Sequence, residues 1–174
     1  MVRRLALGLL VTAIACSGGG TNKTSSVPET MKLTSSAFAD NGAIPKEFTC
    51  EGANQPPPLA WSGVPPGTTA LALVMEDIDA KFLHWVFYGI DPSVTSLPSS
   101  VGAVETRNDF GKVGYGGPCP RPGTTHHYVF TIYALPGKIG FPDIQTATRV
   151  SKDGIDRMPP SASGKLTGTY KLGG

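Results

Sequence analysis

The sequence predicts a mainly β domain that is rich in tight turns and has one short helix near its C-terminus. Glycine and proline account for 22 and 16 of the 174 residues, and they separate short apolar runs along the whole chain. Charged residues make up only 16% and aromatic residues 8%. This composition is typical of short strands joined by turns, and it disfavours a helix bundle or a disordered chain. The length favours a single domain.

Strands are expected where apolar, β-branched and aromatic residues cluster between turn residues. These predicted strands lie at 31–38, 70–75, 85–90, 127–135 and 165–172. Turns are expected at Asn41-Gly42 and at 65–67, where glycine or proline interrupts the pattern. The one helix is expected at 143–158, after Pro142 and before Pro159.

The first fifteen residues have the pattern of an export signal. A short basic start at 1–4 precedes the apolar run LALGLLVTAIA at 5–15. In a helix that rises ~1.5 Å per residue, this run reaches only about half way across a bilayer. We therefore expect residues 1–15 to be a signal peptide that is removed during export.

Cys16 follows the small residues Ala13 and Ala15, and this short segment resembles the lipobox of bacterial lipoproteins, with Ala13 where leucine is usual. The resemblance implies that Cys16 is acylated and becomes the mature N-terminus. Residues 16–30 then form a lipidated flexible tether. The domain is expected to be lipid-anchored at the cell envelope, facing the periplasm or the exterior. The alternative is cleavage after Ala15 and a soluble secreted protein.

Charge is balanced over the remaining chain, 31–174, which we expect to be the folded domain. Three of the 15 basic residues and one of the 13 acidic residues precede Met31, which leaves twelve of each. No run of like charges provides a footprint for a nucleic-acid backbone. We expect no nucleic-acid partner, and this length supplies a core large enough to fold without a metal.

Cys50 and Cys119 remain once Cys16 is acylated. An even pair of cysteines in an exported protein favours a disulfide, which would close a loop of about 70 residues and contribute roughly 4 kcal/mol. The alternative is a pair of buried free thiols. A reduced Cys119 would then be a candidate reactive thiol.

Polar residues cluster where the predicted strands end. Asp77, Asp79 and His84 lie between the strands at 70–75 and 85–90, and a glycine-proline segment at 114–120 leads into the strand that begins near His126. Imidazoles, hydroxyls and the N–H groups of a glycine loop donate to anions. Carboxylates repel anions, but they accept hydrogen bonds from an ammonium group or keep an imidazole charged. The alternative for Asp-x-Asp is ordinary turn chemistry.

Strand geometry decides which of two adjacent histidines can reach such a site. Neighbouring residues of a strand point to opposite faces. His126 and Tyr128 therefore share one face, and His127 takes the other. We expect only His126 to join the site.

Several segments of the chain resemble the phosphatidylethanolamine-binding protein family, in the bacterial branch named for its likeness to Raf kinase inhibitor protein. They are PPLAWSGVPPGT at 57–68, EDIDA at 76–80, HWVFYGI at 84–90, NDFGKVGYGGPCP at 108–120, HHYVFTIYAL at 126–135 and LTGTY at 166–170. The resemblance implies an antiparallel β-sandwich with a small cavity for phosphate or a phospholipid headgroup. The ligand-binding residues that it implies are Asp77, Asp79, His84, Gly117, Pro118, His126 and Tyr128.

The chain departs from the family pattern around the expected cavity. Ile78 and Lys81 stand where the two prolines of the Asp-Pro-Asp-x-Pro motif belong, and His127 replaces an arginine. The loop before His84 is also short. Kinase inhibition is not expected, because that activity belongs to cytosolic relatives and the export signal directs this chain elsewhere.

The expected function is therefore non-enzymatic binding of a small anion, with no catalytic residue, metal or cofactor. The alternative is a protein-interaction module, such as an inhibitor of an extracytoplasmic protease. A metal-dependent hydrolase is a third class, but no HxH, HExxH or CxxC spacing places two ligands on one element. Ser62 lacks the Gly-x-Ser-x-Gly elbow of a nucleophilic hydrolase.

Overall fold

The computed structural model describes residues 27–97, 103–137 and 159–173. Their elements, in chain order, are β1 (Lys32–Ser35), β2 (Gly42–Ala43), the 3-10 helix η1 (Lys46–Phe48), β3 (Leu59–Ser62), β4 (Ala70–Asp77), β5 (Phe82–Ile90), β6 (Val104–Glu105), β7 (Thr125–Leu135) and β8 (Ala162–Lys171). The mainly β prediction is confirmed, and the helix expected at 143–158 lies outside the described residues. Nowhere in these ranges is a helix long and apolar enough to cross a membrane.

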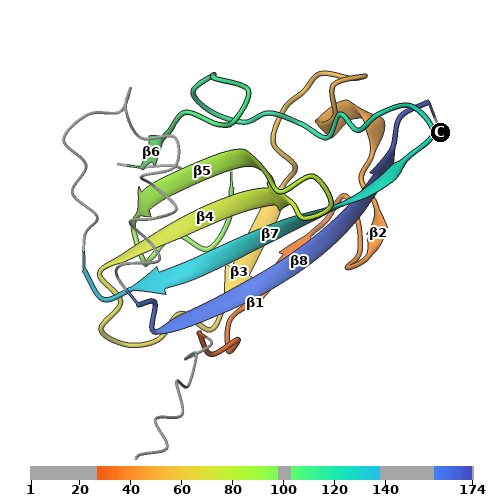
Figure 1. Cartoon of the computed structure of the whole chain (residues 1–174). Helices are drawn as coiled ribbons and strands as arrows, with labels where there is room; N and C mark the ends of the chain where they lie inside the picture. Colours follow the sequence, from red (N-terminus) through yellow and green to blue (C-terminus); the bar gives the residue numbers. More distant parts are fainter. Residues whose placement is uncertain (1–26, 98–102, 138–158, 174) are drawn as a thin grey trace, which may run out of the picture.

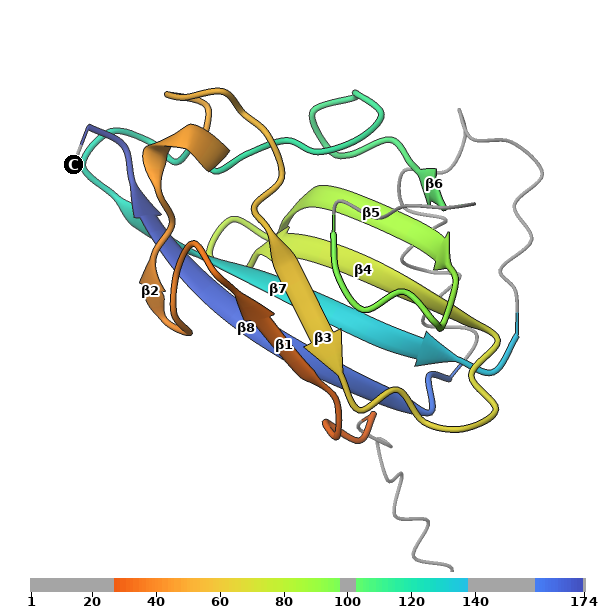
Figure 2. The same ribbon diagram turned by 180° about the vertical axis from the view of Figure 1, so that it is seen from behind.

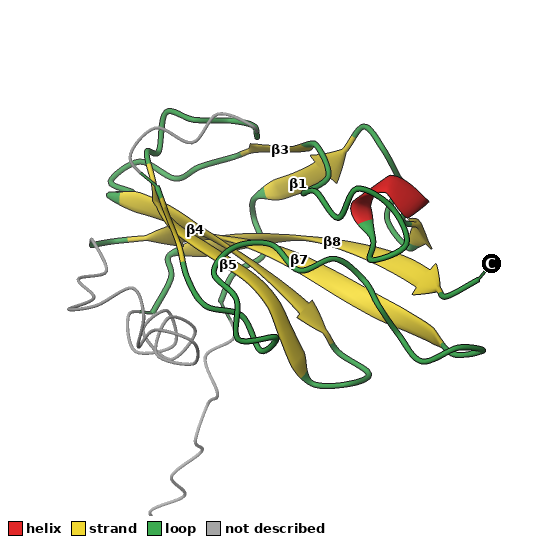
Figure 3. Cartoon of the chain, turned by 90° about the horizontal axis from the view of Figure 1, so that it is seen from above, coloured by secondary structure: helices red, strands yellow, loops and turns green. Residues whose placement is uncertain are grey.

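Six strands form one twisted sheet in the order β2-β8-β7-β4-β5-β6 (Figure 1). Its neighbouring strands are antiparallel, except that β2 and β8 are parallel. β1 and β3 pair as a second, two-stranded antiparallel sheet. The small sheet lies over one face of the large sheet (Figures 2 and 3). This layered arrangement agrees with the expected antiparallel sandwich.

Side chains alternate across the large sheet and divide the core into two clusters. On β4, Leu73 and Met75 face the small sheet and belong to the same cluster as Trp61 of β3. Ala72 and Val74 belong to a second cluster on the opposite face. β4 is therefore buried on both faces, which explains why its sequence is continuously apolar rather than alternating.

The predicted disulfide between Cys50 and Cys119 is present, with the two Cα atoms 5.5 Å apart. It joins the segment just after η1 to the loop that leads into β7. Both cysteines are exposed, so the alternative of two buried thiols is wrong. The disulfide holds a loop in place next to the candidate site described below.

Candidate functional site

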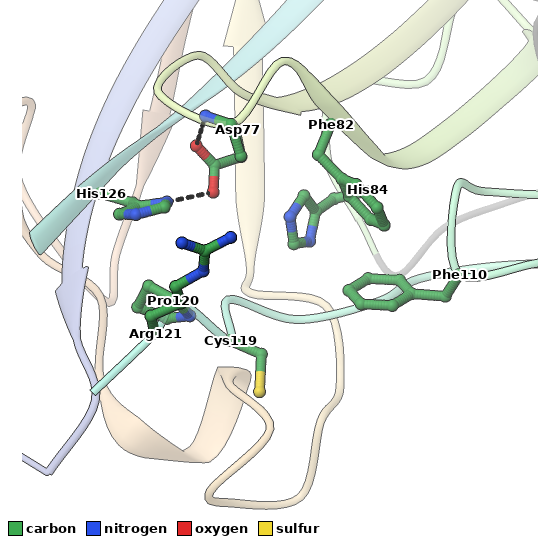
Figure 4. Close-up of a pocket in the computed structure, with 9 residues that line it drawn as sticks. Asp77, Phe82, His84, Phe110, Cys119, Pro120, Arg121 and His126 are labelled. Atoms are coloured by element: carbon green, nitrogen blue, oxygen red, sulfur yellow. Dashed lines mark hydrogen bonds and ion pairs between the residues drawn. The ribbon is translucent and has the colours of Figure 1, made fainter. Parts of the chain in front are cut away.

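A cavity of about 170 Å³ lies beside the β4–β5 turn and the loop before β7 (Figure 4). It is lined by Asp77, Ala80, Phe82, His84, Phe110, Cys119, Pro120, Arg121 and His126. A larger cavity of about 340 Å³ is lined by Phe48, Gln55, Leu97 and the prolines at 56–58, and none of these side chains is ionisable. The smaller cavity gathers the ionisable groups and is therefore the candidate site.

The face of the large sheet that carries the main core continues into this cavity. Asp77 follows Met75 in the alternation of β4, and it lies opposite Tyr128 of β7. The rings of His126 and Tyr128 stack, with centroids 6.5 Å apart. His127 instead pairs with an exposed aspartate outside the cavity. The prediction that His126 and Tyr128 share a face is confirmed.

A β-bulge directs His84 into the cavity. In the β4–β5 pair, Met75 lies opposite Trp85 and Glu76 lies opposite Leu83, which leaves His84 as an extra residue. His84 and Trp85 consequently both face the main core side, whereas Leu83 packs in the cluster on the other face. An extra residue of this kind re-aims a side chain without interrupting the sheet.

His84 is held as a neutral imidazole. Its side chain is buried, and its Nδ1 lies 2.7 Å from the carbonyl oxygen of Gly116. A carbonyl only accepts, so Nδ1 carries the proton and donates it. Burial lowers the pKa of His84 from its ordinary value, and the Gly116 carbonyl and the Asp77 carboxylate oppose this shift less strongly. Its Nε2 is therefore an acceptor, which corrects the expectation that His84 donates to an anion.

Asp77 organises the cavity from its buried position at the end of β4. Its Oδ1 accepts from the backbone N–H groups of Asp79 and Ala80, at 3.0 and 2.9 Å. Its Oδ2 lies 2.6 Å from Nδ1 of His126. The carboxylate therefore closes the β4–β5 turn and orients the His126 ring, and it has little acceptor capacity left for a ligand.

Tyr128 does not line the cavity, but its ring contacts the rings of His84 and His126, which do. The residue is fully buried, and its hydroxyl makes no hydrogen bond of standard geometry within the described residues. Burial and the nearby Asp77 carboxylate raise the pKa of Tyr128 above its ordinary value, so the hydroxyl keeps its proton. Tyr128 therefore supports the two imidazoles from behind the lining.

Asp79 lies outside the cavity lining, in contrast to the expectation. Its Oδ2 accepts from the backbone N–H of His127 at 2.6 Å and lies 3.0 Å from the Nδ1 of the same residue. These contacts lower the pKa of Asp79. Asp79 therefore fastens the turn to the outer side of β7, and it does not face the ligand space.

Gly117 and Pro118 do not line the cavity, although the chain continues directly from them into the lining residues Cys119 and Pro120. The N–H of Gly117 donates to Oδ1 of Asn54 at 2.7 Å, and the carbonyl of Pro118 accepts from the N–H of Cys50 at 3.1 Å. A Cβ at Gly117 would lie 2.5 Å from the carbonyl oxygen of Phe48. The glycine is required by this close approach, and its N–H is already engaged.

Arg121, Phe82 and Phe110 were not identified from the sequence. Figure 4 shows the Arg121 guanidinium between His126 and His84. Phe82 and Phe110 pack edge to face with centroids 4.6 Å apart, and both rings contact His84. A lone arginine directly after the glycine-proline loop is the signal that would have identified Arg121.

Two alternative chemistries find little support in the described ranges. No group of three or more His, Cys, Asp or Glu side chains is arranged there to hold a metal ion. Ser62 lies on β3 opposite Lys32 and does not line the cavity.

The chain resembles known proteins along most of its length. Residues 34–171 match the family model for the phosphatidylethanolamine-binding protein. The chain is 36% identical to the "Putative lipoprotein LppC" of Mycobacterium tuberculosis, over 95% of this chain and 92% of that protein. It is 38% identical to a UPF0098 protein of Methanothermobacter thermautotrophicus, over 82% of this chain and all of that protein.

Solved structures share the fold. YbcL of E. coli, described as a new member of the mammalian PEBP family, superposes with a TM-score of 0.74 at 30% identity, over 82% of this chain and 99% of that chain. CT736 of Chlamydia trachomatis gives a TM-score of 0.71 at 32% identity, over 82% and 98%. Because sequence and fold agree over most of the domain, the chain belongs to the phosphatidylethanolamine-binding protein family.

Proposed function

We propose that the protein is a non-enzymatic binding protein of the cell envelope, and that it holds phosphate or a phospholipid headgroup in the cavity at Asp77, His84 and His126. Family membership supports a binding function. The observation that carries the proposal is the cavity itself, which is lined by the Asp77–His126 pair, by the second imidazole of His84 and by the guanidinium of Arg121.

The size of the cavity favours a headgroup over a whole lipid. Its volume of about 170 Å³ is below the ~300–1,000 Å³ of pockets that enclose drug-sized ligands. A phosphoryl group and a few neighbouring atoms fit in this space. Acyl chains would remain outside the cavity.

The lining side chains favour binding over catalysis. Among the described residues that line the cavity, none is Ser, Thr or Lys, and the sulfur of Cys119 is bonded to Cys50. The hydroxyl, amine and free-thiol nucleophiles of covalent catalysis are therefore missing from this lining, and the carboxylate of Asp77 is held by three hydrogen bonds. The protein should release no nitrophenol from p-nitrophenyl phosphate, and turnover that disappears in His126→Ala would contradict a pure binding role.

The N-terminal segment supports placement at the cell envelope. Cys16 is the proposed acylation site, and the relative with "lipoprotein" in its name matches 95% of this chain. The protein should fractionate with membranes and carry acyl groups on its N-terminal peptide, as read by mass spectrometry. Cys16→Ser should move it to the soluble fraction. Equal fractionation of both forms would support a soluble secreted protein instead.

The anion site is tested by following the three imidazoles by NMR while inorganic phosphate, and then phosphoethanolamine, is added. The resonances of His84 and His126 should shift together, because both rings line the cavity. His127 should not shift, because it pairs with Asp79 outside the cavity. If no imidazole moves, the cavity is not an anion site, and a role in binding an extracytoplasmic protein becomes the better proposal.

A further inference from the structure

The carboxylate of the cavity is already engaged. Asp77 is the only carboxylate among the described residues that line it, and it accepts from two backbone N–H groups and from His126. The second aspartate of the turn, Asp79, is occupied by His127 outside the cavity. An ethanolamine ammonium group would therefore meet no free carboxylate inside.

The cation of the cavity, in contrast, is unpaired. Arg121 forms no ion pair within the described residues, and no hydrogen bond from its guanidinium reaches another of them. Its carbonyl accepts from the backbone N–H of Thr124 at 3.1 Å and from the Thr124 hydroxyl at 2.7 Å. Pro120 and Pro122 flank it in sequence and fix the neighbouring φ angles. The backbone that carries the guanidinium is thus held in place.

A guanidinium recognises oxygen anions in a defined way. It is always charged, and its planar fork donates two parallel hydrogen bonds to a pair of oxygens on one centre. Figure 4 shows the fork directed into the space between His126 and His84. Both of these histidine rings pack against the buried ring of Tyr128, which fixes the borders of that space.

His84 makes a second and independent demand on the ligand. Its Nδ1 donates to Gly116, and its Nε2 is left as an acceptor that makes no hydrogen bond to a described residue. A ligand that fills the cavity must therefore supply a donor to this nitrogen or bring a proton with it. A phosphomonoester in its monoanionic form has a P–OH group that can donate. A phosphodiester has no donor on its phosphoryl group, and the ammonium group of an ethanolamine headgroup would have to leave water without a free carboxylate to receive it.

We propose that Arg121 determines the ligand class of the cavity, and that together with His84 it selects terminal phosphomonoesters over the phosphodiester headgroup of phosphatidylethanolamine. This inference rests on the proposed anion site. The phosphomonoester uses two terminal oxygens for the Arg121 fork, and its P–OH group reaches Nε2 of His84. A phosphodiester has only two terminal oxygens, so one of these contacts stays unmade.

The proposal is tested by calorimetric titration with glycerol 3-phosphate, a monoester, and with glycerophosphoethanolamine, a diester. The monoester should bind about tenfold or more tightly than the diester, because one charge-assisted hydrogen bond contributes about 1.5–3 kcal/mol. Arg121→Ala should weaken the binding of both esters by a similar factor, and Arg121→Lys should recover only part of that binding, because an ammonium group lacks the fork. His84→Phe should abolish most of the preference, because it removes the acceptor of the P–OH group.

Lys112→Ala provides the matched control, since it removes one positive charge from an exposed position outside the cavity lining. It should leave both affinities unchanged. The thermal unfolding transition of each variant should match that of the parent protein. A loss of affinity in such a variant then cannot be explained by unfolding.

The outcomes separate the two proposals. Equal affinity for monoester and diester, or a monoester affinity that Arg121→Ala does not change, overturns the selectivity but leaves the anion site in place. Binding of neither ligand overturns both. If phosphatidylcholine vesicles that contain phosphatidic acid compete with glycerol 3-phosphate, the selectivity is supported and the monoester can come from a lipid. If glycerol 3-phosphate binds and these vesicles do not compete, the selectivity is supported for a soluble monoester.

Discussion

Two aspartate–histidine pairs lie close together, with the aspartates two residues apart and the histidines adjacent, yet they differ in almost every property. Asp77 and His126 meet at 2.6 Å on the inner face of the sheet, with side-chain exposures of 4% and 19%. Asp79 and His127 meet at 3.0 Å on the outer side, at 42% and 46%. The inner pair lines a cavity, whereas the outer pair faces solvent.

The difference shows that position in the fold, rather than residue type, gives such a pair its chemistry. The inner carboxylate is buried, and its loss would leave unsatisfied donors behind. The outer pair is hydrated and screened, so its contribution to stability is small.

Removing the disulfide should disturb the inner pair and spare the outer one. The double variant Cys50→Ser, Cys119→Ser frees a loop with a sequence separation of 69 residues. The free energy of unfolding should fall by about 4 kcal/mol, as measured by urea denaturation. Phosphate binding should weaken, because Cys119 and its neighbours form one wall of the cavity. Unchanged stability would show that the wall is held by its packing alone.

Asp77→Ala should cost about 3 kcal/mol of unfolding free energy, because it leaves two backbone N–H groups and the ring of His126 without their acceptor. Asp79→Ala is the matched control at an exposed carboxylate, with an expected cost below about 1 kcal/mol. Equal costs in urea denaturation would mean that burial does not separate the two pairs.

The buried imidazole beside the inner pair should make stability depend on pH. An unfolded histidine binds its proton near a pKa of about 6.5, whereas burial lowers the pKa of His84 in the folded state. Between these two pKa values the unfolded state carries more protons, so stability falls as the pH is lowered. The loss should approach about 1.4 kcal/mol per pH unit within that window.

Urea denaturation from pH 7 to pH 5 measures this dependence. His84→Gln should flatten it, because glutamine does not titrate. His127→Ala should leave it in place. A His84→Gln profile that matches the parent would mean that His84 does not control the window.

The smallest effect is expected at the outer pair. His127→Ala should change the unfolding free energy by less than about 0.5 kcal/mol at pH 7. The pKa of Asp79 should rise toward its ordinary value, because the ring of His127 contributes to lowering it. Carboxyl titration by NMR measures this change. If the pKa of Asp79 is the same in the variant, the backbone N–H of residue 127 alone lowers it.

The sequence predicted the long strands because their side chains repeat a simple pattern. The expected strands at 70–75, 127–135 and 165–172 correspond to β4, β7 and β8. β4 extends two residues further at its C-terminal end, and β7 and β8 begin two and three residues earlier than expected. β8 also ends one residue earlier. The very short strands β2, β3 and β6 were not predicted, because two to four residues give no periodic pattern.

The candidate site was partly predictable. Strand alternation places His126 and Tyr128 on one face, and the disulfide follows from cysteine counting. The positions of Asp79 and Gly117 were not predictable, because each depends on a hydrogen bond with a residue distant in sequence. Arg121 could have been named as a candidate from its place directly after the glycine-proline loop, but its reach into the cavity depends on loop conformation, which leaves no periodic trace in the sequence.

The bulge at His84 makes the site separable from its scaffold. Trp85 and Leu83 already face opposite sides of the sheet, so excision of the single residue between them would leave β5 in regular alternation with β4. The sheet would lose no core side chain, but the cavity would lose its neutral imidazole. Loss of one codon at this point would thus remove the imidazole from the cavity and leave the fold as it is.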